Sequence, residues 1–209
     1  MLAASAGGFE VLRTVVGSLP ADFPAAIALV HHRTVKHAEL LTQLLARRTH
    51  LRVVDATAEA RLMRGVVYIA PPDQHLLITP ARTIALVGGV TIKHLRSAAD
   101  PLFVSAAAAY GQRVAAVVLS GYDSDGSDGS RAVRSAGGIV IAQSPPSALV
   151  PSMPRSAIAT GTVDMVIDPV GIAAALVLWA AQPIAAERHP AAATGAPARE
   201  RKPAGELRA

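Results

Sequence analysis

Three short stretches of this chain carry residue types that together could perform nucleophilic catalysis. Residues 4–8, Ala-Ser-Ala-Gly-Gly, place Ser5 before two glycines, and glycines leave backbone N–H groups able to face an anion or a developing oxyanion. His31 and His32 follow an apolar run, and residues 123–129 form an acidic loop, Asp-Ser-Asp-Gly-Ser-Asp-Gly. A serine nucleophile, a histidine base and an aspartate that orients the base are the parts of a catalytic triad.

Each stretch also has a simpler interpretation. A serine before a helix is more often an N-cap, and a histidine beside a buried strand is more often a packed core residue. In the acidic loop, Asp125 or Asp128 could cap the helix that follows. The loop does not match an EF-hand calcium site, because the sixth position from Asp123 is Asp128 instead of glycine and the twelfth is Arg134 instead of glutamate. The residues alone therefore leave these roles open.

The hydrophobic pattern predicts an α/β fold: a doubly wound, mostly parallel sheet with helices on both faces and a β-hairpin excursion. Residues 114–119 are wholly apolar and rich in valine, so we expect this strand near the middle of the sheet. Open α/β sheets place functional groups at the carboxyl ends of their strands, where the histidines and the acidic loop fall. The predicted strands are 25–30, 51–54, 66–70, 114–119, 138–142 and 163–167, the hairpin strands are 76–78 and 83–87, and the predicted helices are 9–19, 36–48, 100–110, 131–136, 153–160 and 170–181.

The composition of the chain indicates a globular protein and argues against several other classes. Hydrophobic residues make up 51% of the 209 residues, which is ample for a core. The net charge is +5, but several basic residues lie in residues 183–209, a Pro/Ala/Arg-rich segment that we expect to be a flexible tail after a domain of residues 1–182. The remaining basic residues are scattered, so we expect no nucleic-acid partner. There is no cysteine, no apolar run of membrane-spanning length and no signal-peptide pattern, so we expect a cytoplasmic protein without membrane insertion.

Six blocks of sequence, running from residue 4 and covering the chain to about residue 181, resemble the catalytic domain of the chemotaxis protein-glutamate methylesterase (CheB) family. Their order along the chain is the family's order, which is far more specific than one Ser-x-Gly-Gly turn. The blocks are residues 4–8, His32, residues 68–75 (Tyr-Ile-Ala-Pro-Pro-Asp-Gln-His), residues 96–103, residues 119–126 (Leu-Ser-Gly-Tyr-Asp-Ser-Asp-Gly) and residues 153–157 (Met-Pro-Arg-Ser-Ala).

This resemblance implies a triad in which Ser5 is the nucleophile, His32 the general base and Asp125 the acid that orients it. The implied reaction is hydrolysis of γ-glutamyl methyl esters on the cytoplasmic region of a methylated chemoreceptor, with glutamine deamidation in some cases. Backbone N–H groups at Ala6 and Tyr122 are the expected oxyanion donors. The resemblance implies no cofactor and no metal, and the expected partner is the receptor substrate.

The chain departs from the family pattern in three places. The family has an apolar strand before the nucleophile turn, but only Met1, Leu2 and Ala3 precede Ala4, so we expect a truncated N-terminus without the first strand. The regulated members carry a phospho-receiver domain before the catalytic domain, and none stands before the turn in this sequence, so we expect a chain that resembles a stand-alone catalytic module. The family's Arg-Pro-Ser-x-Asp segment is Arg-Ser-Ala-Ala-Asp at residues 96–100.

Two other functions stay open. One is a catalytically impaired interaction module that keeps the methylesterase fold; the missing strand favours it, and retention of Ser5, His32 and Asp125 opposes it. The other is a phosphate or nucleotide binder that uses residues 5–8, which lacks both a Gly-x-Gly-x-x-Gly and a Lys-Ser/Thr signature.

Overall fold

The computed structural model describes residues 1–32 and 38–182. The predicted tail, residues 183–209, and the first two residues of the helix predicted at 36–48 lie outside the described residues.

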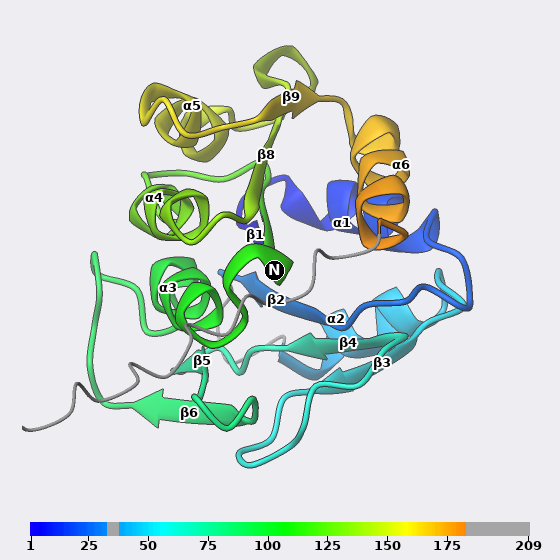
Figure 1. Cartoon of the computed structure of the whole chain (residues 1–209), viewed down its shortest axis with the longest axis vertical. Helices are drawn as coiled ribbons and strands as arrows, with labels where there is room; N and C mark the ends of the chain where they lie inside the picture. Colours follow the sequence, from blue (N-terminus) through cyan, green and yellow to red (C-terminus); the bar gives the residue numbers. More distant parts are fainter. Residues whose placement is uncertain (33–37, 183–209) are drawn as a thin grey trace, which may run out of the picture.

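A seven-stranded parallel sheet forms the centre of the molecule (Figure 1). Its order reverses on either side of the first strand, so the predicted doubly wound topology is confirmed. The strand predicted at 114–119 lies beside the central strand, as its apolar composition indicates. In spatial order the strands are β3 (Arg52–Asp55), β4 (Val66–Ile69), β2 (Ile27–His31), β1 (Leu2–Ala4), β7 (Ala115–Val118), β8 (Ile139–Gln143) and β9 (Met165–Ile167).

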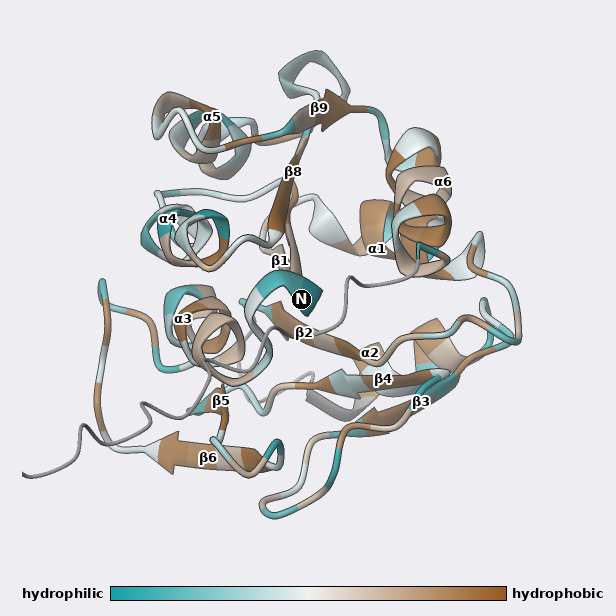
Figure 2. Ribbon diagram, in the orientation of Figure 1, coloured by the Kyte–Doolittle hydropathy of each residue, from teal (hydrophilic) through white to brown (hydrophobic). Residues whose placement is uncertain are grey.

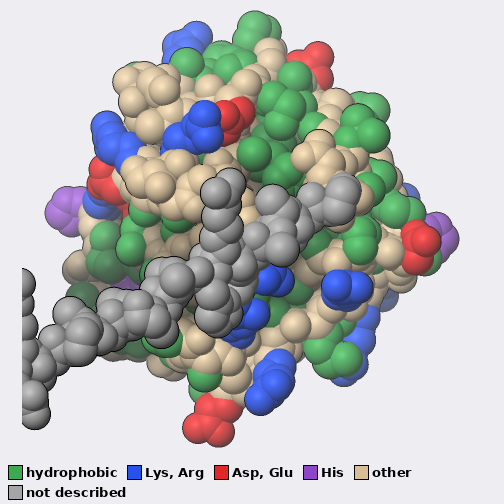
Figure 3. All heavy atoms as spheres, in the orientation of Figure 1, with side chains coloured by type: hydrophobic (Ala, Val, Ile, Leu, Met, Phe, Trp, Pro, Cys, Tyr) green, Lys and Arg blue, Asp and Glu red, His purple; other side chains and the backbone are tan. Residues whose placement is uncertain are grey.

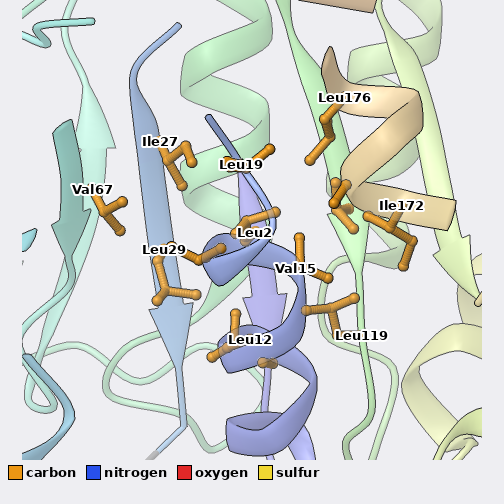
Figure 4. Close-up of a cluster of buried hydrophobic side chains, with 14 of the residues drawn as sticks. Leu2, Leu12, Val15, Leu19, Ile27, Leu29, Val67, Leu119, Ile172 and Leu176 are labelled. Carbon is orange, nitrogen blue, oxygen red and sulfur yellow. The ribbon is translucent and has the colours of Figure 1, made fainter. Parts of the chain in front are cut away.

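Helices cover both faces of the sheet, and each face has its own apolar core. Figure 1 shows α3, α4 and α5 on one side and α1 and α6 on the other. Figure 4 shows Leu12 and Val15 of α1 between Leu29 of the sheet and Ile172 of α6, in one buried apolar cluster. In Figure 2 the strands β8 and β9 are brown while α4 carries teal, as expected for a helix with one face in water. The helices are α1 (Gly8–Gly17), α2 (Ala38–Ala46), α3 (Ala99–Tyr110), α4 (Ser127–Ser135), α5 (Ser152–Ala159) and α6 (Pro169–Ala180).

The predicted hairpin is present but stands apart from the main sheet. Strands β5 (Gln74–Ile78) and β6 (Ile84–Gly88) pair antiparallel as a separate two-stranded sheet. Leu76, Ile78 and Ile84 bury their side chains in the core of the α3 face. The hairpin therefore supports the start of α3, which is part of the candidate site.

The expectation that the first strand is missing is wrong. Leu2–Ala4 forms β1, which pairs with β2 on one side and β7 on the other. Three residues suffice because both neighbours supply backbone hydrogen-bond partners and Leu2, Ala3 and Ala4 are all buried. Ser5 therefore follows the central strand of the sheet and does not lie on a frayed end.

Within residues 1–32 and 38–182, every helix is too short or too polar to cross a membrane. The face that carries the N-terminus in Figure 1 shows several lysine and arginine side chains in its lower half (Figure 3).

The α-amino group of Met1 predicts a dependence of stability on pH. Its nitrogen is partly buried and donates to the carbonyl oxygen of Ala115 at 2.6 Å, and the loss of water around it lowers its pKa from 8.0 to about 5. The unfolded amine binds a proton below pH 8 but the folded amine does so only below about pH 5, so stability is lost as pH falls through this window. Between pH 8 and pH 6 we expect this group alone to remove about 2 kcal/mol from the free energy of unfolding.

Urea unfolding at the two pH values tests this prediction, with an Nα-acetylated chain as the control. Met1 borders a hollow of about 810 Å³, which leaves room for the acetyl group. The acetylated chain should lose about 2 kcal/mol less than the unmodified chain over the same interval. Equal losses in the two chains would show that the amine does not contribute.

Candidate active site

Ser5 lies in a tight turn between β1 and α1. Its N–H donates to the carbonyl oxygen of Ser120 at 2.9 Å, and its own carbonyl accepts from the N–H of Gly8 at 2.8 Å. Helix α1 is capped by Gly7, whose φ of 74° is in the left-handed region, and no side chain makes a cap hydrogen bond there. Ser5 is therefore not the helix cap that its sequence context also allowed.

His32 lies directly opposite Ser5 on the neighbouring strand. The register pairs Ala4 with His31, and the His32 N–H donates to the carbonyl oxygen of Ala4 at 3.0 Å. Side chains alternate along a strand, so His32 shares the α3 face with Val30, while His31 lies beside Gly8 on the α1 face. This alternation explains why the second histidine of the pair reaches the acidic loop, where its Nε2 lies 2.7 Å from Oδ2 of Asp125.

Asp125 is fully buried and its carboxylate accepts four hydrogen bonds. Oδ2 accepts from the His32 ring and from the Ala99 N–H at 2.6 Å; Oδ1 accepts from the N–H groups of Asp100 and Gly126, both at 3.0 Å. Burial alone would raise the pKa of Asp125, but the His32 ring and the backbone donors at the start of α3 outweigh it and lower this pKa below its ordinary value. Asp125 is therefore held as an anion against the imidazole.

The other carboxylates of the acidic loop face elsewhere. Asp128 is exposed and pairs with Lys93 at 2.8 Å and with Arg131 at 2.7 Å. The first residue of the loop, Asp123, is also exposed and has a φ of 67°. Among the described residues, no group of three or more histidine, aspartate or glutamate side chains could hold a metal ion.

The expected oxyanion donors are the backbone N–H of Ala6, within the Ser5 turn, and that of Tyr122, which follows Gly121. Within the described part of the chain neither has a protein acceptor. Gly121 packs directly against Ser5 and Met153. A side chain at residue 121 would place its Cβ 2.6 Å from Cβ of Ser5 and 2.1 Å from Sδ of Met153. The segment before Tyr122 thus packs directly against the serine because residue 121 has no side chain.

Ser120 and Gln143 support this turn, and sequence reasoning gave them no role. The buried Ser120 Oγ donates to the carbonyl oxygen of Ala6 at 2.8 Å and accepts from the Val150 N–H at 3.0 Å. Gln143, also buried, accepts from the Ser120 N–H at 2.9 Å. A polar residue that ends an apolar strand, as Gln143 ends β8, is a signal that could have drawn attention to it.

His75 is a second support that sequence reasoning quoted only as part of a motif. It is buried on β5, its Nδ1 accepts from the Ala98 N–H at 3.0 Å, and its Nε2 lies 3.1 Å from the carbonyl oxygen of Val90. Nδ1 must be unprotonated to accept, so Nε2 carries the ring proton. His75 thereby fixes the residue before α3, next to the two N–H groups that hold Asp125.

Replacing Ser120 with alanine should disturb the Ser5 turn. The change leaves the Ala6 carbonyl and the Val150 N–H without their partner, so we expect a loss of about 1–3 kcal/mol in unfolding free energy. We also expect kcat of the hydrolysis proposed below to fall about 10- to 100-fold, because small displacements of a nucleophile are costly. Ser147→Ala, which removes an exposed hydroxyl beside Gln143, is the control and should retain kcat. A Ser120→Ala chain with wild-type kcat would contradict the supporting role.

Comparisons with known proteins show which family the chain resembles. The family model described as CheB methylesterase matches residues 1–176. The chain is 36% identical over 178 residues to the protein-glutamate methylesterase FrzG of Myxococcus xanthus, an overlap of 85% of this chain and 53% of the relative. It is 39% identical over 179 residues to protein-glutamate methylesterase/protein-glutamine glutaminase 3 of Anaeromyxobacter dehalogenans, an overlap of 85% and 52%. The chain thus spans about half the length of these two curated relatives.

A solved structure gives the same result for the fold. The Thermotoga maritima CheB methylesterase catalytic domain superposes with a TM-score of 0.81 at 32% sequence identity. The match covers 85% of this chain and 95% of that domain.

Proposed function

Because the chain belongs to the CheB methylesterase family, we propose that it hydrolyses γ-methyl esters of glutamate side chains, with deamidation of glutamine as a second reaction of the same site. The observation that carries this proposal is the hydrogen bond between His32 and the buried Asp125, one strand away from Ser5. A histidine oriented by a carboxylate beside a serine is the arrangement that activates a hydroxyl for acyl transfer.

In this proposal His32 uses its two ring nitrogens for different tasks. Asp125 faces Nε2, so Nδ1 is the nitrogen that takes the Ser5 proton as Oγ attacks the ester carbonyl. Serine proteases use the opposite assignment, with the aspartate on Nδ1 and the serine on Nε2. Asp125, kept ionised by its hydrogen bonds, stabilises the imidazolium that forms.

The rest of the reaction follows from this proton transfer. The tetrahedral oxyanion is received by the N–H groups of Ala6 and Tyr122, and each such donor typically contributes about 10²–10³ in rate. When the intermediate collapses, the C–O bond to the methoxy group breaks and the imidazolium protonates that group, which leaves as methanol. Water then attacks the glutamyl ester of Ser5 with His32 as base, releasing the glutamate carboxylate and restoring the hydroxyl.

The substrate that we propose is the methylated cytoplasmic region of a chemoreceptor, which places the enzyme in the cytoplasm. We assign the chemistry to a catalytic domain of residues 1–182. The exposed Tyr122 and Leu149 lie beside the serine turn, where a protein substrate has to approach.

The test is release of methanol from a methylated receptor fragment, compared with release of ammonia from the same fragment carrying glutamine. We expect methanol to accumulate over many turnovers per enzyme molecule. A chain that binds the methylated fragment without releasing methanol would instead be the interaction module considered above. The missing first strand was the feature that favoured that alternative, and β1 is present.

A further inference from the structure

Helices α3 and α4 lie side by side (Figure 1), and the N-terminus of each donates N–H groups to a carboxylate at the N-terminus of the other. Asp125, just before α4, accepts from the Ala99 and Asp100 N–H groups at the start of α3. In return Asp100, in the first turn of α3, accepts from the Gly129 N–H in the first turn of α4 at 2.8 Å. The orientation of Asp125 is therefore tied to a second buried carboxylate.

Each of the two carboxylates also has a basic partner. Asp125 faces His32, and Oδ2 of Asp100 accepts from Nζ of Lys93 at 2.7 Å. Lys93 makes its other contact with Asp128, which Arg131 also contacts. Within the described residues, the charged groups linked to the His32 ring are Asp125 directly, and Asp100, Lys93, Asp128 and Arg131 behind it, together with the N-termini of α3 and α4.

Asp100 is costly to bury as an anion. It is 6% exposed, and burial together with the charge of Asp125 raises its pKa, against the lowering effects of Lys93 and the Gly129 N–H. Burial alone would lower the pKa of Lys93, but its hydrogen bonds to Asp100 and Asp128 outweigh this and raise it. Lys93 is therefore a permanent cation at neutral pH, and it favours the charged form of Asp100 beside the His32–Asp125 pair.

We propose that the Lys93–Asp100 ion pair positions and electrostatically tunes the His32–Asp125 pair. Asp100 holds the start of α4, and thereby the loop that carries Asp125, in place. Its negative charge favours the protonated form of His32, and the positive charge of Lys93 limits that effect. The catalytic consequence rests on the function proposed above, but the electrostatic link does not.

The experiment is an NMR titration of the His32 ring, identified by its loss in His32→Gln, in four chains. Asp100→Asn removes one buried negative charge while its side-chain oxygen can still accept from Gly129, so we expect the His32 titration midpoint to fall by about half a pH unit or more. Adding Lys93→Met to Asp100→Asn removes the compensating positive charge, and the midpoint should return toward the wild-type value. Asp128→Asn is the control: its side chain is 60% exposed and screened by water, so the midpoint should move by less than about 0.2 unit.

Unchanged midpoints in both Asp100→Asn and the double variant, with the fold intact by circular dichroism, would overturn the proposal. A further fall in the double variant would also overturn it, because removing the positive charge of Lys93 has to favour the protonated form of His32 and raise the midpoint. On a methylated fragment, Asp100→Asn should lower kcat about 10-fold with little change in KM, and the acidic limb of its pH–rate profile should move in the same direction as the NMR midpoint.

The titration needs no substrate, so the two proposals fail separately. If the midpoints shift in the variants as expected but the wild-type protein releases no methanol, the ion-pair proposal is supported and the esterase is rejected. Methanol release together with unshifted midpoints would support the esterase and reject the ion-pair proposal.

Discussion

Replacing Ser5 with alanine is expected to lower kcat for methanol release by about six orders of magnitude, the loss typical of removing a triad serine. The reason is that Ser5 carries the one hydroxyl of residues 4–8, and the Ser120 Oγ that contacts this turn already donates to the Ala6 carbonyl. Turnover is measured as methanol released from a methylated receptor fragment. Binding of the fragment should be retained, since alanine removes a single oxygen.

Ser152→Ala is the matched control for this change. Its hydroxyl is exposed, lies on α5 and donates to the carbonyl oxygen of Asp123 at 3.0 Å, so kcat should stay at the wild-type value. If the Ser5→Ala protein kept more than a few per cent of wild-type turnover, another group would have to be the nucleophile.

Replacing Asp125 with asparagine is expected to lower kcat by about 10⁴, or about 5 kcal/mol of transition-state stabilisation. Both carboxylate oxygens accept two N–H donors, so the asparagine NH₂ must face a pair of donors whichever way the amide turns. If it faces His32, the imidazole has to take the other tautomer and can no longer accept the Ser5 proton. If it faces the Asp100 and Gly126 N–H groups, the anchoring of the loop is lost.

Asp125 also contributes to the stability of the fold, which thermal unfolding measures separately from kcat. The pKa of Asp125 is lowered in the folded protein, so its ionised form stabilises the fold above its ordinary pKa and this contribution is lost as pH falls through the folded value. Asp125→Asn should therefore also lower the midpoint of thermal unfolding at pH 7. Wild-type kcat in a folded Asp125→Asn chain would remove Asp125 from the mechanism.

The fold could be predicted from sequence where a short apolar run is bounded by turn residues on both sides. The apolar run of residues 114–119 and the paired runs of the hairpin are such segments, and they form the expected strands. The first strand could not be found this way, because Leu2–Ala4 has only Met1 before it and its extended form depends on β2 and β7 on either side. Helix α4 begins at Ser127, earlier than its apolar residues indicated, since the Gly129 N–H is satisfied by Asp100 and the Ser130 hydroxyl by the carbonyl of Gly126.

In the candidate site, the triad residues could be assigned from the sequence, but the residues that support them could not. Ser5, His32 and Asp125 were assigned by resemblance, and the structure adds the reason for choosing His32 over His31, namely the face of β2 from which each side chain projects. The residues that hold them in place could not be assigned. Ser120 reaches Ala6 across more than a hundred residues of chain, and Lys93 reaches Asp100 only after a loop brings it back to α3. Such contacts depend on tertiary neighbours, which a local pattern does not encode.

Whether Ser5 is the nucleophile can be tested most directly by covalent labelling with a fluorophosphonate, followed by peptide mapping. The reagent forms a P–O bond only with a serine whose proton is taken by a neighbouring base, and fluoride leaves. We expect one label per wild-type chain, on the peptide that contains Ser5, with labelling rates reduced in both His32→Gln and Asp125→Asn. A label on another serine, or steady methanol release from a chain whose Ser5 is fully labelled, would contradict the proposed triad.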